Sequence, residues 1–213
     1  MRKTNSNIAR MVGLSMLIAL IAVLQLLGSF IKIGPLPMSF VLVPIVIGGC
    51  LYGAKAGAYL GAVFGVMTMA MGIAGIDALS FLLWQANPPV FIILCILKAT
   101  LAGFCSGLVY KLLEKVFTGK AIYLRTILAS ITAPIVNTGI FVIGMLLFFS
   151  ETAQNLPSLF PTVLGEYNNA IEVVFLGLAG LNFVGEFLVN LLLSPAMVRI
   201  VDIVKNKIQK GHF

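Results

Sequence analysis

The feature that most constrains this sequence is a long apolar stretch, Pro88–Lys111, that carries one lysine, Lys98, deep in its interior. Placing a lysine at the centre of a membrane-spanning helix costs about 3 kcal/mol on insertion scales, so such a side chain normally faces a cavity, a partner or a ligand. The function of the chain therefore depends on what Lys98 faces.

The composition indicates that lipid surrounds the folded chain. Of its 213 residues, 60% are hydrophobic and 10% are charged, whereas soluble domains carry about 25% charged residues. The net charge of +7 does not indicate a nucleic-acid-binding face, because the basic residues lie between apolar segments. The three cysteines lie inside apolar segments, without the spacing of a zinc site or a disulfide framework.

Six apolar segments are expected to cross the membrane. They predict an all-α fold, an integral membrane bundle of six transmembrane helices that forms a single domain over residues 1–213. A spanning helix needs about 20 apolar residues, and the second and third segments are shorter, so we expect them to be tilted, kinked or partly re-entrant. The segments are Arg10–Ile31, Met38–Leu51, Gly57–Gly72, Pro88–Leu113, Ile122–Phe149 and Ala170–Val201.

The basic residues predict the orientation. With the N-terminus inside, nearly all lysines and arginines fall on the inner side and only Lys32 falls outside. The acidic residues Asp77, Glu151 and Glu166 fall on the outer side. This asymmetry follows the positive-inside rule, so we expect a multi-pass protein of the cell membrane with both termini in the cytoplasm. We expect no nucleotide-binding domain in this chain, so ATP-driven transport would need an ATPase on another chain.

Three of the apolar segments carry polar residues at the same depth. Lys98 and Glu186 each lie 13 residues from the inner basic residue of their segment, and Asn137 lies 12 residues from its own. At 1.5 Å per residue these distances are roughly 18–20 Å. Asn182 and Asn190 lie four residues on either side of Glu186, so the three share one helix face, which cannot face lipid. Gln25 of the first segment lies a little further out.

Two interpretations of this polar layer are open. In the first, Lys98 and Glu186 form a buried ion pair and the asparagines satisfy the remaining donors and acceptors. In the second, Lys98 faces a cavity and binds a ligand carboxylate as a point charge with three donors. The two are compatible, because a lysine held by Glu186 can still bind a carboxylate.

The segments Ile73–Asn87 and Ser150–Asn169 are expected to be loops on the outer side, above the polar layer. Each ends in aromatic and amide side chains, which suit a lid over a small polar ligand. The alternative is an aromatic belt at the membrane interface. The candidate lid residues are Trp84, Gln85, Asn87 and Tyr167.

Small residues four apart mark close helix contacts. Glycines recur every four residues from Gly53 to Gly65, which indicates packing between helices of this chain or docking on another membrane subunit. Ser15 and Ala19 form a similar step in the cytoplasmic half of the first segment, where docking on a partner is the more attractive interpretation. The sequence has no catalytic, metal-binding or cofactor-binding motif. We therefore expect neither an enzyme nor a metal or cofactor site.

The whole chain resembles the substrate-binding S components of energy-coupling factor (ECF) vitamin transporters. The resemblance is carried by the six segments, by the step Ser15-x-x-x-Ala19, and by three sequence segments. These are Val41-Leu-Val-Pro-Ile-Val-Ile-Gly-Gly, Tyr52-Gly-Ala-Lys-Ala-Gly-Ala-Tyr-Leu-Gly with Phe64-Gly, and Asn182-Phe-Val-Gly-Glu-Phe-Leu-Val-Asn with Ser194-Pro-Ala. Within the family, the chain is most similar to the pantothenate type.

The resemblance implies a subunit of the bacterial plasma membrane that captures a vitamin from outside and docks on an ECF module of one transmembrane coupling protein and two ATPases. The family's docking motif is usually Ala-x-x-x-Ala, and Ser15 is small enough to keep that contact. For pantothenate, the resemblance implies that Lys98 pairs with the carboxylate while Asn137 and Asn182 hydrogen-bond the rest.

Three alternatives remain at this point. The ligand of an S component could instead be folate, riboflavin or a pyridoxine-like vitamin. The chain could be a stand-alone secondary transporter or a small channel, or a structural membrane protein whose polar layer only fixes the helix register.

Overall fold

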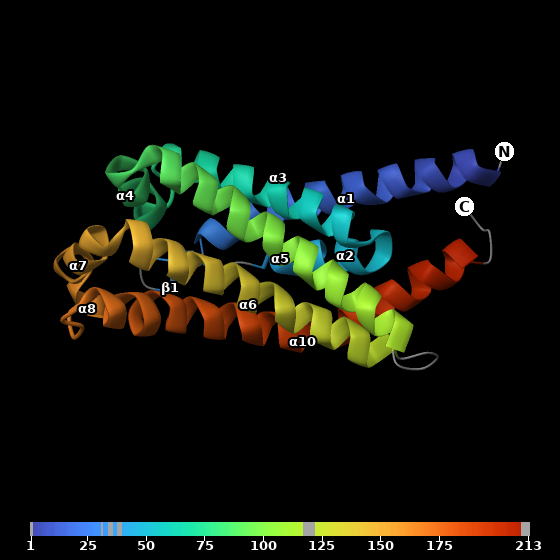
Figure 1. The fold of residues 1–213 in the computed structure, drawn as a ribbon. Coiled ribbons are helices and arrows are strands. Elements are labelled where there is room, and N and C mark those ends of the chain that lie inside the picture. The colour runs from blue at the N-terminus through green and yellow to red at the C-terminus, as the bar shows by residue number, and fades with distance from the viewer. Residues whose placement is uncertain (1, 31, 34–35, 38–39, 117–121, 210–213) are drawn as a thin grey trace.

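A computed structural model describes residues 2–30, 32–33, 36–37, 40–116 and 122–209 of the chain. These residues form an elongated bundle of helices that run roughly parallel or antiparallel to one another (Figure 1). Helix α1 (Arg2–Phe30) begins and helix α10 (Leu181–Gln209) ends at the same end of the bundle, here called the terminal end. The other end, here called the distal end, carries three short helices: α4 (Ala78–Ala86), α7 (Ser150–Leu159) and α8 (Pro161–Leu164).

Five stretches of the described chain are long and apolar enough to cross a membrane. They comprise α1, α3 (Ala54–Ile73), α5 (Pro88–Val116), α6 (Ile122–Phe148), and α10 together with α9 (Ala170–Glu172) and the π-helix η2 (Val173–Gly180). A further apolar helix, α2 (Leu42–Tyr52), has 11 residues and is only about 16 Å long. The predicted all-α membrane bundle is confirmed, with the second of the six expected spans much shorter than a bilayer crossing.

The connection between α1 and α2 contains two short strands. Strand β1 (Lys32–Ile33) pairs antiparallel with β2 (Leu36–Pro37), so that Ile33 lies opposite Leu36. Residues 34–35, between the two strands, and residues 117–121, between α5 and α6, lie outside the described part of the chain.

The expectation of loops at the distal end was wrong. Segment Ile73–Asn87 contains α4, and segment Ser150–Asn169 contains α7 and α8. Helix α4 buries Leu79 and Leu83, and α7 buries Ala153 and Leu156. These apolar faces pack against the same core cluster, and tertiary packing of this kind stabilises helices that are too short to form alone.

The third span is also longer than predicted, because it begins at Ala54. Gly53, which separates it from α2, has φ of 91°, a left-handed conformation that glycine adopts without strain. With 20 residues, α3 has the length of a membrane crossing.

The glycine repeat lies at the contact between α3 and α5. A Cβ added to Gly61 would meet the carbonyl oxygen of Ala99, and one added to Gly65 would lie 2.7 Å from that of Cys95. Gly57 faces Gly103 in the same way. Of the two interpretations that the sequence left open for these glycines, packing within the chain is confirmed. The two helices approach so closely that only hydrogen fits between their backbones.

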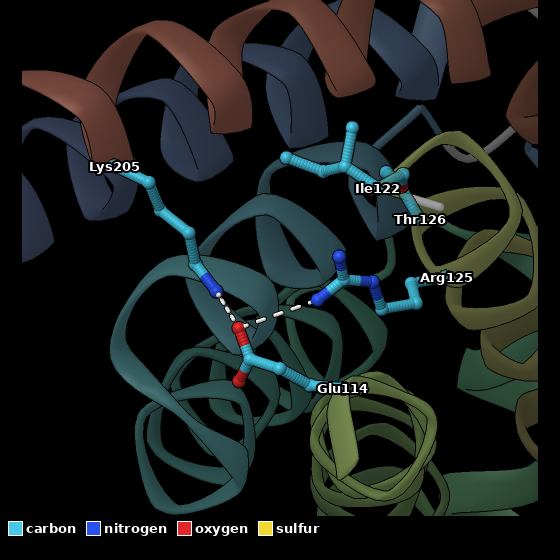
Figure 2. A network of polar contacts seen from close by, with 5 residues as sticks. All are labelled: Glu114, Ile122, Arg125, Thr126 and Lys205. Carbon is cyan, nitrogen blue, oxygen red and sulfur yellow. Dashed lines mark hydrogen bonds and ion pairs between the residues drawn. The ribbon is translucent and has the colours of Figure 1, made fainter. Parts of the chain in front are cut away.

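An ion-pair network joins three helices at the terminal end (Figure 2). The carboxylate of Glu114 on α5 accepts a hydrogen bond from Lys205 of α10 at 2.8 Å and lies 3.6 Å from the guanidinium of Arg125 on α6. The Lys205 ammonium also lies 4.4 Å from the centre of the Tyr110 ring. Because the Glu114 side chain is 47% exposed, each ion pair of this network contributes only about 1 kcal/mol or less to the stability of the fold.

Replacing Gly61 with alanine is expected to destabilise the bundle, because the added Cβ overlaps with the α5 backbone at Ala99. Overpacking of this kind costs about 1–3 kcal/mol, so the Tm of the purified protein in detergent falls. Gly139→Ala on α6 is the matched control, since a Cβ there meets no atom within 4 Å. Equal melting temperatures for the two variants would contradict the close contact between α3 and α5.

Candidate functional site

A cavity of about 70 Å³ lies between six helices, α1, α3, α4, α5, α6 and α10. Its apolar wall includes Phe64, Leu83, Phe91 and Phe141. Its polar wall combines hydroxyl, amide and charged side chains from all six helices. These polar lining residues are Gln25, Ser29, Thr68, Asp77, Ser80, Lys98, Asn137, Asn182 and Glu186.

Four residues of the predicted polar layer line this cavity. Lys98 comes from α5, Asn137 from α6, and Asn182 and Glu186 from α10. Lys98 lies ten residues after Pro88, so it is roughly 15 Å from the distal end of α5. The cavity therefore lies within the bundle, nearer to its distal end than to its terminal end.

Among the described residues that line the cavity, Lys98 is the only cation. Its ammonium lies 5.1 Å from the centre of the Phe141 ring, at cation–π distance. The ion pairs found among the described residues join Glu114 to Arg125 and Lys205, and neither includes Lys98. The Lys98 ammonium therefore lies on the cavity wall without a direct carboxylate partner in the described part of the protein.

Glu186 is held by an asparagine on the neighbouring helix. Its side chain is 3% exposed, and its Oε2 accepts a hydrogen bond from Nδ2 of Asn137 at 3.2 Å. Asn182 lies close to the same carboxylate, and Lys98 is near enough to interact with it electrostatically. The direct ion pair that the sequence allowed between Lys98 and Glu186 is thus replaced by this amide contact.

Asn190 has different surroundings from Asn182 and Glu186, which lie on the same face of α10. Its Nδ2 donates to the backbone carbonyl of Glu186, one turn earlier, at 2.8 Å. It is fully buried and is absent from the cavity lining. The stripe of Asn182, Glu186 and Asn190 therefore supplies two cavity residues and one side chain that bonds to its own helix.

The structure places the four candidate lid residues outside the cavity lining. Trp84 packs edge-to-face on Phe91, with ring centroids 6.3 Å apart, and Phe91 itself lines the cavity. Gln85 is exposed, and the side-chain oxygen of Asn87 accepts from the backbone N–H of Val90 at 3.4 Å. Tyr167 packs against the core cluster at the distal end. A lid role for these residues stays a prediction.

Sequence reasoning missed the contribution of α4. Asp77 and Ser80 both line the cavity, although the segment that holds them was expected to be a loop. An aspartate before an apolar run is a helix N-cap signal, and this signal could have predicted α4. It could not have predicted that the cap faces the polar layer.

Ser15 and Ala19 lie on a separate surface. Both are exposed on α1 and line a shallow groove with Ile8, Met11, Val12 and Met16. The Ser15 hydroxyl donates to the carbonyl of Met11 at 3.0 Å, so its polar hydrogen is satisfied within the helix. The groove is mainly apolar and includes two small residues, Ser15 and Ala19, and small residues are enriched where helices pack closely in membranes.

Comparison with known families decides the class of the protein. The family model of the ECF transporter substrate-specific component matches residues 9–198. The chain belongs to this family. It is a multi-pass membrane protein and the substrate-binding component of an ECF transporter, which has a small-molecule substrate and an ECF module as its partner. The family comprises transporter subunits and not enzymes. No curated protein matches the chain.

Proposed function

We propose that this S component captures a small water-soluble vitamin that carries a carboxylate, and that the vitamin is pantothenate. The observation that carries the proposal is the Lys98 ammonium on the cavity wall, which has no direct carboxylate partner among the described residues. A charge away from water is unfavourable unless it is paired. A ligand carboxylate supplies the missing partner, because the ammonium offers three donors to it.

The amides beside Lys98 suit the remaining groups of pantothenate, which are two hydroxyls and an amide. The side-chain oxygen of Asn137 is buried and has no hydrogen-bond donor among the described residues, so it is free to accept from a ligand hydroxyl or N–H. Asn182 lines the cavity next to it. Glu186, already bonded to Asn137, orients that amide rather than contacting the carboxylate of the ligand.

The size of the cavity implies that binding widens it. Its volume of about 70 Å³ suits a few water molecules, whereas pockets for small organic ligands measure about 300–1,000 Å³. With nine residues, α4 is the shortest of the helices that line the cavity, and Trp84 on α4 packs against Phe91 on α5. We propose that α4 moves with Trp84, Gln85 and Asn87, and that Tyr167 closes the distal end beside them.

The charges at the two ends of the bundle support an orientation with the terminal end in the cytoplasm. The terminal end carries the basic residues Lys55, Lys111, Arg125 and Lys205, whereas four of the seven acidic residues belong to the segments at the distal end, namely Asp77, Glu151, Glu166 and Glu172. This distribution follows the positive-inside rule. In this orientation the cavity lies nearer to the outer side of the membrane, and the groove around Ser15 and Ala19 lies in the cytoplasmic half of α1.

Replacing Lys98 with methionine is expected to weaken pantothenate binding about 10- to 100-fold, the usual worth of a charge-assisted hydrogen bond. The measurement is isothermal titration calorimetry of the purified protein. Pantothenol, in which an alcohol replaces the carboxylate, is expected to bind the wild-type protein weakly. Its affinity is expected to be about the same in Lys98→Met, because it has no carboxylate to pair with the lysine. The preference for pantothenate over pantothenol therefore disappears in the variant.

Lys111→Met is the matched control, because Lys111 lies on the same helix and is exposed. It is expected to bind pantothenate like the wild-type protein. Unchanged pantothenate affinity in Lys98→Met would refute the role of Lys98. Binding of folate, riboflavin or pyridoxine in place of pantothenate would refute the choice of vitamin and leave the transport class intact.

Replacing Ala19 with tryptophan is expected to abolish co-purification with the ECF module, because the indole fills the groove on α1 that we propose as the docking surface. Vitamin binding is expected to persist, since Ala19 does not line the cavity. Leu20→Trp is the control, because Leu20 is exposed on α1 but does not line the groove. Retained co-purification of Ala19→Trp would place the docking surface elsewhere.

A further inference from the structure

We propose that Asp77 is a second substrate-recognising residue, which accepts a hydrogen bond from a hydroxyl group of the substrate at the distal side of the cavity. Asp77 lines the cavity and is 8% exposed. Its Oδ1 is buried and has no hydrogen-bond partner among the described residues. The inference rests on the proposed function in one respect, because it takes Lys98 as the site of the substrate's carboxylate.

The two oxygens of Asp77 have different surroundings. Oδ2 caps α4 by accepting from the backbone N–H of Ser80 at 3.3 Å, and it also accepts from the Ser80 hydroxyl. The cap uses only this oxygen, and asparagine or serine would serve equally well at an N-cap. Capping therefore accounts for Oδ2 and leaves Oδ1 as a buried acceptor without a donor, which is unfavourable unless a ligand or water supplies one.

The charges around the cavity define the class of substrate. Lys98 lines it as a cation, and Asp77 and Glu186 line it as acids. Glu186 already receives an amide hydrogen bond from Asn137, whereas Oδ1 of Asp77 receives none from the described residues. A second anionic group beside Asp77 would be repelled, so the site suits a molecule with one carboxylate and neutral donors away from it.

The positions of the two residues give the orientation of that molecule. Asp77 precedes α4 at the distal end (Figure 1), and Lys98 lies about 15 Å along α5 from the same end. The carboxylate therefore lies deeper in the bundle, and the hydroxyl end lies beside the start of α4. Pantothenate has this arrangement, with its hydroxyls at the opposite end from its carboxylate. A hydroxyl bound to Oδ1 also links substrate binding to the position of α4, since the other oxygen holds the start of that helix.

The decisive variant is Asp77→Asn. It keeps an oxygen for the cap on α4 and replaces the free acceptor with an amide donor, which cannot accept from a hydroxyl. Pantothenate is expected to bind about 10- to 100-fold more weakly, as for the loss of a hydrogen bond to a charged group, while the Tm of the ligand-free protein stays unchanged. Asp77→Ala, which removes the cap as well, is expected to lower that Tm. Asp202→Asn is the control, since Asp202 is exposed on α10.

An analogue tests the direct contact. The acyl-β-alanine that keeps the carboxylate, the amide and the carbon skeleton of pantothenate but lacks both hydroxyls is expected to bind the wild-type protein weakly. In Asp77→Asn the difference between pantothenate and this analogue is expected to shrink, because the two changes remove the same hydrogen bond. An undiminished difference in the variant would overturn the proposal, as would wild-type pantothenate affinity.

The outcomes separate this inference from the proposed function. If Lys98→Met loses pantothenate and Asp77→Asn does not, the role of Asp77 is refuted and the proposed function stands. If riboflavin or pyridoxine binds instead of pantothenate, the choice of vitamin falls, and a loss of that binding in Asp77→Asn supports Asp77 while unchanged binding refutes it. If none of pantothenate, riboflavin, pyridoxine and folate binds the wild-type protein, both proposals are refuted.

Discussion

The structure depends on the cost of placing the Lys98 ammonium among apolar helices. Hydrocarbon offers no hydrogen bonds, so polar groups within a membrane bundle must find partners inside it. Here α5, α6 and α10 turn Lys98, Asn137 and Glu186 toward one cavity, while large apolar side chains such as Leu97 and Leu188 stay exposed on the outer faces of the same helices. Substrate recognition follows from the same constraint, because a cavity that collects the polar groups of a membrane protein is also the place where a polar ligand is stabilised.

Much of this arrangement could be predicted from the sequence because a helix rises by a constant amount per residue. Counting from the basic residues at the terminal end placed Lys98, Asn137 and Glu186 at one depth, and all three line the same cavity. The glycine repeat of α3 likewise predicted a close helix contact, and the structure identifies α5 as the partner. Both predictions use distances along single helices, which do not change with the tertiary fold.

The rest could not be predicted, because it depends on rotation and packing between helices. Depth alone did not show that Asn190 bonds to its own backbone, or that Glu186 is bonded to Asn137 rather than paired directly with Lys98. The segment Ser150–Asn169 was too polar to suggest helices, and α7 forms because Ala153 and Leu156 pack against the core cluster at the distal end. The position of Asp77 in the cavity wall also depends on tertiary packing, because α4 is in contact with α3 and α5.

The most direct test of the central claim is the distance between the Lys98 amine nitrogen and the carboxyl carbon of bound pantothenate. Solid-state NMR of the protein in lipid, with labelled lysine and labelled ligand, measures this distance, and the Lys98 signal is identified by its absence in Lys98→Met. The account predicts a strong dipolar coupling, which corresponds to ion-pair contact within about 4 Å. Bound pantothenate whose carboxyl carbon shows no coupling to the Lys98 nitrogen would contradict it.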